Sequence, residues 1–334
     1  MKLLILGGTK FLGRHLTEAA LTAGHEVTLF NRGQTNTGLF PDVEQLHGDR
    51  DTAEGLAVLA GRRWDAVVDT SGYIPRHVRD SATVLKDAVE HYTFISTISV
   101  YANDIALNAD ESAALQTLAD PTVEVVTGES YGGLKVLCEQ AAEQVMPGRV
   151  LHVRSGLIVG PHDHTDRFTY WPVRVSQGGE MLTPGSPAAA TQFVDARDQA
   201  AWIIRMAEAH TAGIFNLTGP STPCTLGDVL ATSQTVSGSS ATFTWVSEEF
   251  LAAQQVAPWA DIPCWLPDAD NNMQKLSINK ALEKGFTTRP LAETIADTLA
   301  WFTARPDPQL RAGISRQREA ELLAAWKQQR SASN

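Results

Sequence analysis

Two side chains four residues apart, Tyr131 and Lys135, have the spacing of one helical turn and so share one face of a helix. A lysine ammonium beside a phenol favours the phenolate and lowers the tyrosine pKa from about 10 toward neutrality. Such a tyrosine can serve as general acid or base when a carbonyl and an alcohol interconvert. Because Tyr-x-x-x-Lys pairs are common on helix surfaces, this reading needs support from other residues.

A hydroxyl-rich run, Ser96–Tyr101, gives that support because it follows a short apolar strand expected at Phe94–Ile95. In an α/β fold the run would lie at the carboxyl edge of the sheet, where ligands bind. A hydroxyl at that edge can form a hydrogen bond to a substrate oxygen.

A glycine-rich turn stands between an apolar run at Leu3–Leu6 and a helical pattern at Phe11–Ala23. Glycines in such a strand–turn–helix let the backbone approach a pyrophosphate, which the helix N-terminus binds. The spacing is that of GxxGxxG, except that Lys10 replaces the middle glycine. The cofactor contacts predicted here are Gly7, Thr9, Lys10, Phe11, Leu12 and Gly13.

The segment Asn31-Arg32-Gly33, after an expected strand at Val27–Phe30, contains no acidic residue. An acidic residue in this region binds the ribose hydroxyls of NAD, whereas an arginine suits the 2′-phosphate of NADP. Arg32, with Lys10 or Arg14, is therefore predicted to hold that phosphate, which favours NADP(H) over NAD(H). The alternative is that Arg32 is a solvated surface charge.

Asp49 and Arg50 follow the third expected strand, Val43–Leu46, and are predicted cofactor contacts, as are Asn31 and Arg32. Asp49 can accept a hydrogen bond from the adenine amino group, or it can cap the helix that follows.

Strand-like and helix-like segments alternate through the first half of the chain, which predicts βαβ units. We expect an α/β fold with a Rossmann-type, doubly wound parallel sheet in residues 1–154. Residues 193–218 are expected to return to this sheet through strands at Phe193–Ala196 and Ile214–Leu217. Residues 155–330 are dense in Gly, Pro and aromatic residues, and we expect them to form mainly a smaller C-terminal substrate-binding cap and the C-terminal helices.

Together these features resemble the short-chain dehydrogenase/reductase superfamily, in its extended, epimerase/dehydratase-like branch. The resemblance covers about residues 1–302 and rests on Gly7–Gly13, Asp49, Ser96–Tyr101, Tyr131 with Lys135, Arg154 with Val159–Pro161, and Gln192–Asp198. It implies that Tyr131 is the acid/base, that Lys135 holds the nicotinamide ribose and tunes Tyr131, and that Thr97 is the catalytic hydroxyl. It also implies that Thr70, Ser71, Gly72 and Val159 line the cofactor.

Departures from the family pattern weigh against dehydration of nucleotide sugars and weaken the case for other nucleotide-sugar substrates. Relatives that dehydrate nucleotide sugars carry an Asp-Glu pair after the catalytic threonine, and here Ile98 and Ser99 stand there. Leu157 and Gln192 stand where nucleotide-sugar enzymes often carry an asparagine and an arginine. Substrate contacts are expected from Ser99, Tyr73, Arg167 and Gln192.

We therefore expect an NADP(H)-dependent oxidoreductase that interconverts a carbonyl and a secondary alcohol on a small organic substrate. The alternative is an NAD(P)-dependent nucleotide-sugar epimerase. A third interpretation is a relative that binds RNA or senses the cofactor without turnover.

The charge and composition of the chain indicate which classes of partner and ligand are not expected. The 334 residues carry a net charge of −11, and an acidic chain repels nucleic acid. No apolar stretch approaches the ~18 residues of a membrane helix, and three scattered cysteines fit a reducing cytoplasm. His162 and His164 have no third ligand nearby, so no metal site is expected. The family resemblance implies a homodimer.

Overall fold

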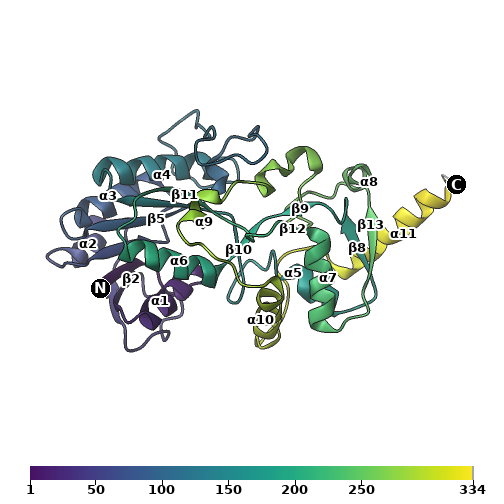
Figure 1. Ribbon diagram of the computed structural model, residues 1–334, viewed down its shortest axis with the longest axis horizontal. Coiled ribbons are helices and arrows are strands. Elements are labelled where there is room, and N and C mark those ends of the chain that lie inside the picture. The colour runs from purple at the N-terminus through teal and green to yellow at the C-terminus, as the bar shows by residue number, and fades with distance from the viewer. Residues whose placement is uncertain (333–334) are drawn as a thin grey trace. The chain divides into compact units, whose positions relative to one another are not determined.

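The computed structural model describes residues 1–332 and divides into two compact units (Figure 1). The first unit comprises residues 1–156, 196–218 and 276–287. The second comprises residues 157–195 and 219–275, together with the chain from residue 288 onward.

The first unit is built on a seven-stranded parallel sheet of order β11-β6-β5-β4-β1-β2-β3. Its central strands are buried on both faces, which explains their nearly continuous apolar sequences. This arrangement confirms the Rossmann-type α/β fold. The strands are β1 (Lys2–Leu6), β2 (Glu26–Asn31), β3 (Glu44–His47), β4 (Ala66–Asp69), β5 (His91–Thr97), β6 (Val150–Ser155) and β11 (Gly213–Leu217).

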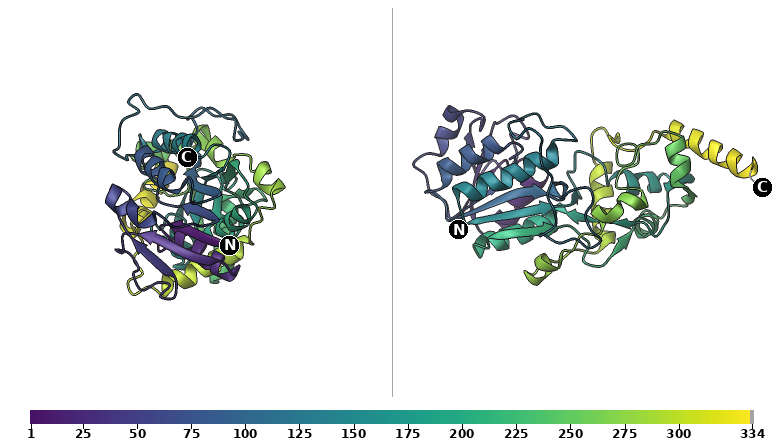
Figure 2. Two further views of the ribbon diagram at one scale, coloured as in Figure 1. Left: turned by 90° about the vertical axis from the view of Figure 1, so that its left-hand side faces the viewer. Right: turned by 90° about the horizontal axis from the view of Figure 1, so that it is seen from above.

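Helices cover both faces of this sheet (Figure 2). Helices α1 (Leu12–Thr22) and α6 (Ala196–Glu208) pack together on one face, and α3 (Pro75–Leu85) and α4 (Tyr131–Val145) pack together on the other. Short helical segments fill the connections, namely α2 (Ala53–Leu56), η1 (Ala57–Leu59), η2 (Ile98–Val100) and α9 (Asn279–Glu283).

The second unit pairs its short strands in three two-stranded sheets, β10–β7, β12–β9 and β13–β8. Glu319 ties the last helix to β8, because its carboxylate accepts hydrogen bonds from Arg174 Nε at 2.9 Å and from the Leu182 amide at 3.1 Å. The elements are β7 (Leu157–Val159), α5 (Tyr170–Ser176), β8 (Glu180–Pro184), β9 (Ala190–Thr191), β10 (Phe193–Asp195), β12 (Cys224–Thr225), α7 (Leu226–Ser237), β13 (Thr242–Val246), α8 (Glu248–Ala253), η3 (Asp268–Gln274), α10 (Leu291–Thr303) and α11 (Arg316–Ala332).

One predicted strand has a different partner in the structure. Phe193–Ala196 was expected to return to the large sheet, but β10 pairs in parallel with β7 in the second unit. Ile214–Leu217 does join the large sheet, within the edge strand β11. A short, mainly apolar segment such as Phe193–Asp195 predicts a buried strand but carries no information about which strand it pairs with, and this explains the difference.

The buried imidazole of His91, at the start of β5, makes the stability of the first unit depend on pH. His91 is 1% exposed, and burial together with the stacked His210 lowers its pKa to about 4. Below pH 6.5, His91 binds a proton in the unfolded chain but not in the folded chain. The folded state therefore loses stability as the pH is lowered from 6.5 to about 4.

We expect the free energy of unfolding of the wild type to fall by about 2 kcal/mol relative to His91→Gln between pH 7.5 and pH 5. Urea denaturation of both proteins at several pH values measures this difference. A difference that stays constant across the range would contradict the assignment.

Candidate functional site

The strand ends of the first unit bring the predicted cofactor residues to one edge of the sheet. β1 runs into the glycine turn 7–13, β2 ends at Asn31, and Asp49 follows β3. Thr70 follows β4, and Thr97 is the last residue of β5. Because the strands are parallel, these residues all lie at the carboxyl edge.

The glycine turn requires glycine at both of its ends. Gly7 has a φ of +115°, and a Cβ there would lie 2.3 Å from Oγ1 of Thr70. A Cβ on Gly13 would lie 2.7 Å from the backbone nitrogen of Gly8. The turn therefore presents backbone at the N-terminus of α1, an arrangement that binds a pyrophosphate.

The side chains around this turn differ in exposure. Thr9 and Leu12 are buried, and Phe11 is half-buried. Lys10 and Arg32 are both exposed, so these two cations are available to a ligand at the rim of the turn.

The segment 31–33, at the end of β2, presents a guanidinium and no carboxylate. Asn31 Oδ1 accepts a hydrogen bond from the Gly33 amide at 2.8 Å and so shapes the turn that carries Arg32. Asn36 Nδ2 donates to the Thr9 carbonyl at 2.7 Å, which ties this loop to the glycine turn. Asp49, on the neighbouring loop, is exposed.

Lys135 is 3% exposed, and its ammonium is held by backbone carbonyls. Nζ donates to the carbonyl of Gly72 at 2.7 Å and to that of Ile95 at 2.6 Å, and it lies 4.1 Å from the centre of the Phe94 ring. Burial lowers the pKa of Lys135 to about 8. Tyr131 is the first residue of α4, one turn earlier, and is half-buried.

Thr97 and Ser99 form a pair of linked hydroxyls at the end of β5. Thr97 Oγ1 accepts the Ser99 amide at 3.1 Å and donates to Ser99 Oγ at 3.2 Å. A glycine cradle, a phenol, an ammonium and two hydroxyls thus stand at one sheet edge. Such a set can bind a dinucleotide and move a proton at an oxygen atom.

Arg50 is placed inside the protein and not at the rim of the site. Its guanidinium donates to both carboxylate oxygens of Asp69, at 2.7 and 2.8 Å, and to Ser71 Oγ at 3.0 Å. The sequence predicts Arg50 as a cofactor-binding residue. The structure shows its guanidinium bound to Asp69 and to the Thr70–Gly72 loop, and its role toward the cofactor stays a prediction. Tyr73, which follows that loop, is 51% exposed.

Sequence reasoning missed two buried carboxylates near the lysine, Asp69 and Glu139, both of which raise the Lys135 pKa. Glu139 accepts hydrogen bonds from Arg154 NH2 at 2.8 Å and from Ser96 Oγ at 2.5 Å. Two features of the sequence could have indicated these two carboxylates. Glu139 stands one helical turn beyond Lys135, and Asp69 ends an otherwise apolar strand.

Three predicted residues belong to the second unit. Val159 is buried in β7. Arg167 Nε donates to Thr165 Oγ1 at 3.2 Å, and the backbone N–H of Gln192 donates to Gln274 Oε1 at 2.7 Å. The roles of Val159, Arg167 and Gln192 toward cofactor and substrate stay predictions.

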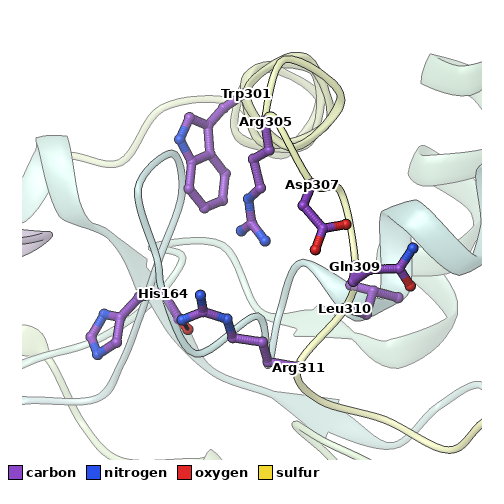
Figure 3. Close-up of a pocket in the computed structure, with 7 residues that line it drawn as sticks. All are labelled: His164, Trp301, Arg305, Asp307, Gln309, Leu310 and Arg311. Carbon is purple, nitrogen blue, oxygen red and sulfur yellow. Dashed lines mark hydrogen bonds between the residues drawn. The ribbon is translucent and has the colours of Figure 1, made fainter.

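The second unit also contains a cavity of about 340 Å³ (Figure 3). Arg305 projects into it, paired with Asp166 and with its Cζ 3.9 Å from the centre of the Trp301 ring. Arg311 NH1 donates to the His164 carbonyl at 3.3 Å. The lining comprises His164, Trp301, Arg305, Asp307, Gln309, Leu310 and Arg311, and therefore does not include Arg167 or Gln192.

Among the residues that the structure describes, no three or more His, Cys, Asp or Glu side chains are grouped so that they could hold a metal ion. Within the same residues, every helix is too short or too polar to cross a membrane.

A model of the NAD dependent epimerase/dehydratase family matches residues 3–218. Two curated relatives are the chloroplast stem-loop binding protein of 41 kDa b from Arabidopsis thaliana, 25% identical over 65% of this chain, and the epimerase family protein SDR39U1 from Bos taurus, 26% identical over 67%. The matched region spans 58% of the Arabidopsis protein and 76% of the bovine one.

Among solved structures, the UDP-glucuronic acid 4-epimerase of Bacillus cereus in complex with NAD has a similar fold. The match has a TM-score of 0.66 at 16% identity and covers 90% of this chain and 96% of that one.

The contacts of Gly13 generate a stability prediction. Alanine at this helical position gains about 1 kcal/mol in helix propensity, but its Cβ meets the backbone of Gly8, which cannot move without displacing the turn. We expect Gly13→Ala to lower the free energy of unfolding by about 1–2 kcal/mol net.

Gly128→Ala is the matched control, because a Cβ there meets nothing within 4 Å. Urea denaturation compares the two variants. Equal stability of both would show that the turn tolerates a side chain.

Proposed function

The chain belongs to the NAD dependent epimerase/dehydratase family, and from this premise we propose that it is an NADP(H)-dependent oxidoreductase acting on a small organic substrate. The observation that carries the proposal is the buried Lys135 ammonium, held one helical turn from Tyr131 at the sheet edge that also bears the glycine turn and Thr97. The reaction is the interconversion of a carbonyl and a secondary alcohol.

The residues present fit a dinucleotide. The glycine turn keeps its backbone close to the first turn of α1, because side chains at Gly7 or Gly13 would collide with Thr70 or with the backbone of Gly8 and displace it. Backbone N–H groups at such a helix N-terminus can bind a pyrophosphate. Once bound, the nicotinamide supplies or accepts the hydride.

The chain's own side chains hold the substrate and move the proton. Tyr131 donates a proton to the substrate oxygen during reduction and removes it during oxidation. Lys135 stabilises the phenolate through its charge and holds the nicotinamide ribose. The hydroxyls of Thr97 and Ser99 orient the substrate oxygen by hydrogen bonding.

Support for NADP(H) comes from the rim of the glycine turn. Lys10 and Arg32 are exposed there, and the segment 31–33 offers no carboxylate to a ribose hydroxyl. A 2′-phosphate would accept charge-assisted hydrogen bonds from Arg32. The NAD complex of the Bacillus cereus enzyme favours the other cofactor and makes a direct test necessary.

A second candidate is a nucleotide-sugar epimerase, which the family and the structural similarity to a UDP-sugar epimerase favour. It uses the same hydride and proton steps but regenerates its cofactor in each turnover. Leu157 and Gln192, in place of the asparagine and arginine of nucleotide-sugar enzymes, weigh against it.

A third candidate is the RNA binding considered from the sequence, and the name of the Arabidopsis relative, a stem-loop binding protein, favours it. The net charge of −11 weighs against it, and RNA retention that declines steeply with salt would support it.

Parallel calorimetric titrations of cofactor-stripped protein with NADPH and NADH test the cofactor. We expect tighter binding of NADPH, and a loss of about tenfold or more in NADPH affinity, ~1.5 kcal/mol, in Arg32→Ala. Arg62→Ala is the control, because Arg62 is exposed and pairs with Glu44.

Preference for NADH would contradict the assignment of Arg32. Cofactor that cannot be stripped would favour the epimerase, and no binding of either nucleotide would contradict an enzymatic function.

Replacement of Tyr131 tests the chemistry. Tyr131→Phe removes the proton donor but keeps the ring, so kcat should fall by about 10²- to 10⁴-fold with cofactor affinity unchanged. NADPH oxidation measured against a panel of aldehydes and ketones identifies the reductase, and UDP-sugar isomerisation without net NADPH use identifies the epimerase. Full activity in Tyr131→Phe would contradict the acid/base role.

A further inference from the structure

A buried ion pair, Arg50–Asp69, lies beneath the loop that follows β4. Besides its bidentate contact with the carboxylate, the guanidinium donates at 3.0 Å to Ser71 Oγ, Ser81 Oγ and the His77 carbonyl. Removing two charges from water offsets most of their attraction, so a buried pair is weak as a source of stability alone. No step of the proposed chemistry involves this ion pair.

The pair fixes the backbone of the Thr70–Gly72 loop. Asp69 Oδ1 accepts the Ser71 amide at 3.0 Å, and Arg50 holds the Ser71 hydroxyl. The loop is closely packed at Gly72, where a Cβ would lie 2.6 Å from Cγ2 of Val78. The Gly72 carbonyl is therefore held in one place.

That carbonyl is one of the two acceptors of the Lys135 ammonium, and the Ile95 carbonyl is the other. Three elements thus meet at one nitrogen atom: the loop after β4, the strand β5 and the helix α4. Movement of the loop would remove an acceptor from a buried ammonium, which is unfavourable unless another acceptor replaces it.

Asp69 is itself close enough to Lys135 to raise its pKa. Arg50 binds both oxygens of this carboxylate, so the ammonium is left to backbone carbonyls. Glu139, the other carboxylate near Lys135, is likewise bound by Arg154.

We propose that Arg50 and Asp69 are positioning residues for Lys135: they hold the Gly72 carbonyl in place, and Arg50 keeps the Asp69 carboxylate from capturing the ammonium. The proposal rests on the role given above to Lys135 beside Tyr131. Without the Arg50 guanidinium, the buried Asp69 carboxylate keeps only the Tyr92 hydroxyl, at 2.8 Å, and the Ser71 amide, at 3.0 Å, as hydrogen-bond donors, and no cation is paired with it.

The surroundings of the ammonium give the direction of the effect. Burial lowers the pKa of Lys135, Asp69 raises it and Arg50 lowers it. Loss of Arg50 removes a lowering influence and frees Asp69, so both consequences raise this pKa, whereas loss of the Asp69 charge lowers it. The groups facing the ammonium are Asp69, Glu139, Cys138 and Arg50, with the rings of Phe94 and Tyr73.

The test is a pH titration of lysine ¹⁵Nζ resonances in the full chain without cofactor, with Lys135 assigned through Lys135→Arg. The wild-type midpoint is expected near 8. We expect Arg50→Gln to raise the midpoint by about one pH unit and Asp69→Asn to lower it by about one. The double variant should return close to the wild type, and Arg62→Gln should leave the midpoint unchanged because its ion pair is exposed.

Unchanged midpoints in folded Arg50→Gln and Asp69→Asn would overturn the proposal. If Arg50→Gln does not fold, Asp69→Asn remains the test, and a midpoint that does not fall in this folded variant overturns the proposal. In turnover assays of alcohol oxidation, the acidic limb of the kcat/KM profile reports loss of the Tyr131 proton. Arg50→Gln should move this limb to higher pH, because the freed Asp69 charge disfavours the phenolate. Shifted midpoints in a chain that turns over none of the substrates would support the positioning pair and contradict only the proposed function.

Discussion

The contact on which the candidate site depends is the Lys135 ammonium held between the carbonyls of Gly72 and Ile95. An ammonium that leaves water must recover its lost hydration through close acceptors, so the carbonyls and the helix cannot move independently. The neighbouring strands β4 and β5 set the spacing of the two carbonyls. Tyr131, one turn earlier on the same helix, takes its position relative to the sheet edge from this contact.

Two arginine–carboxylate pairs lie near the Lys135 ammonium, and each of them holds one part of the site in position. Arg50–Asp69 holds the loop that supplies one carbonyl, and Arg154–Glu139 reaches the strand end through Ser96, the residue before Thr97. The first pair therefore orders the lysine side of the site, and the second ties the hydroxyl side to α4. Apolar replacements for such pairs are often no less stable, so stability alone does not explain their presence.

The sequence predicts the parts of this molecule that depend on local pattern. Alternating apolar segments indicate the parallel sheet, glycine spacing indicates the turn after β1, and a four-residue spacing places Tyr131 and Lys135 on one helix face. Partners distant in the chain are not predicted in this way. The sequence predicts Arg50, next to Asp49, as a cofactor contact. It does not predict the ion pair of Arg50 with Asp69, which lies 19 residues further along the chain on another strand of the sheet. The pairing of β10 with β7 is missed for the same reason.

The residues after Thr97 limit which reactions this edge can support. Interconversion of a carbonyl and an alcohol needs a single proton donor or acceptor at the reacting oxygen, and the proposed function assigns this role to the Tyr131 phenol beside the Lys135 ammonium. Elimination of water from a sugar needs a further acid and base on the neighbouring carbons, and Ile98 and Ser99 offer neither. Reduction and epimerisation both satisfy the first condition, because each transfers a hydride and a proton at one carbon–oxygen bond. They differ in whether the oxidised substrate leaves or is turned and reduced again. That choice depends on how the rest of the substrate is held and not on the chemistry of Tyr131 and Lys135.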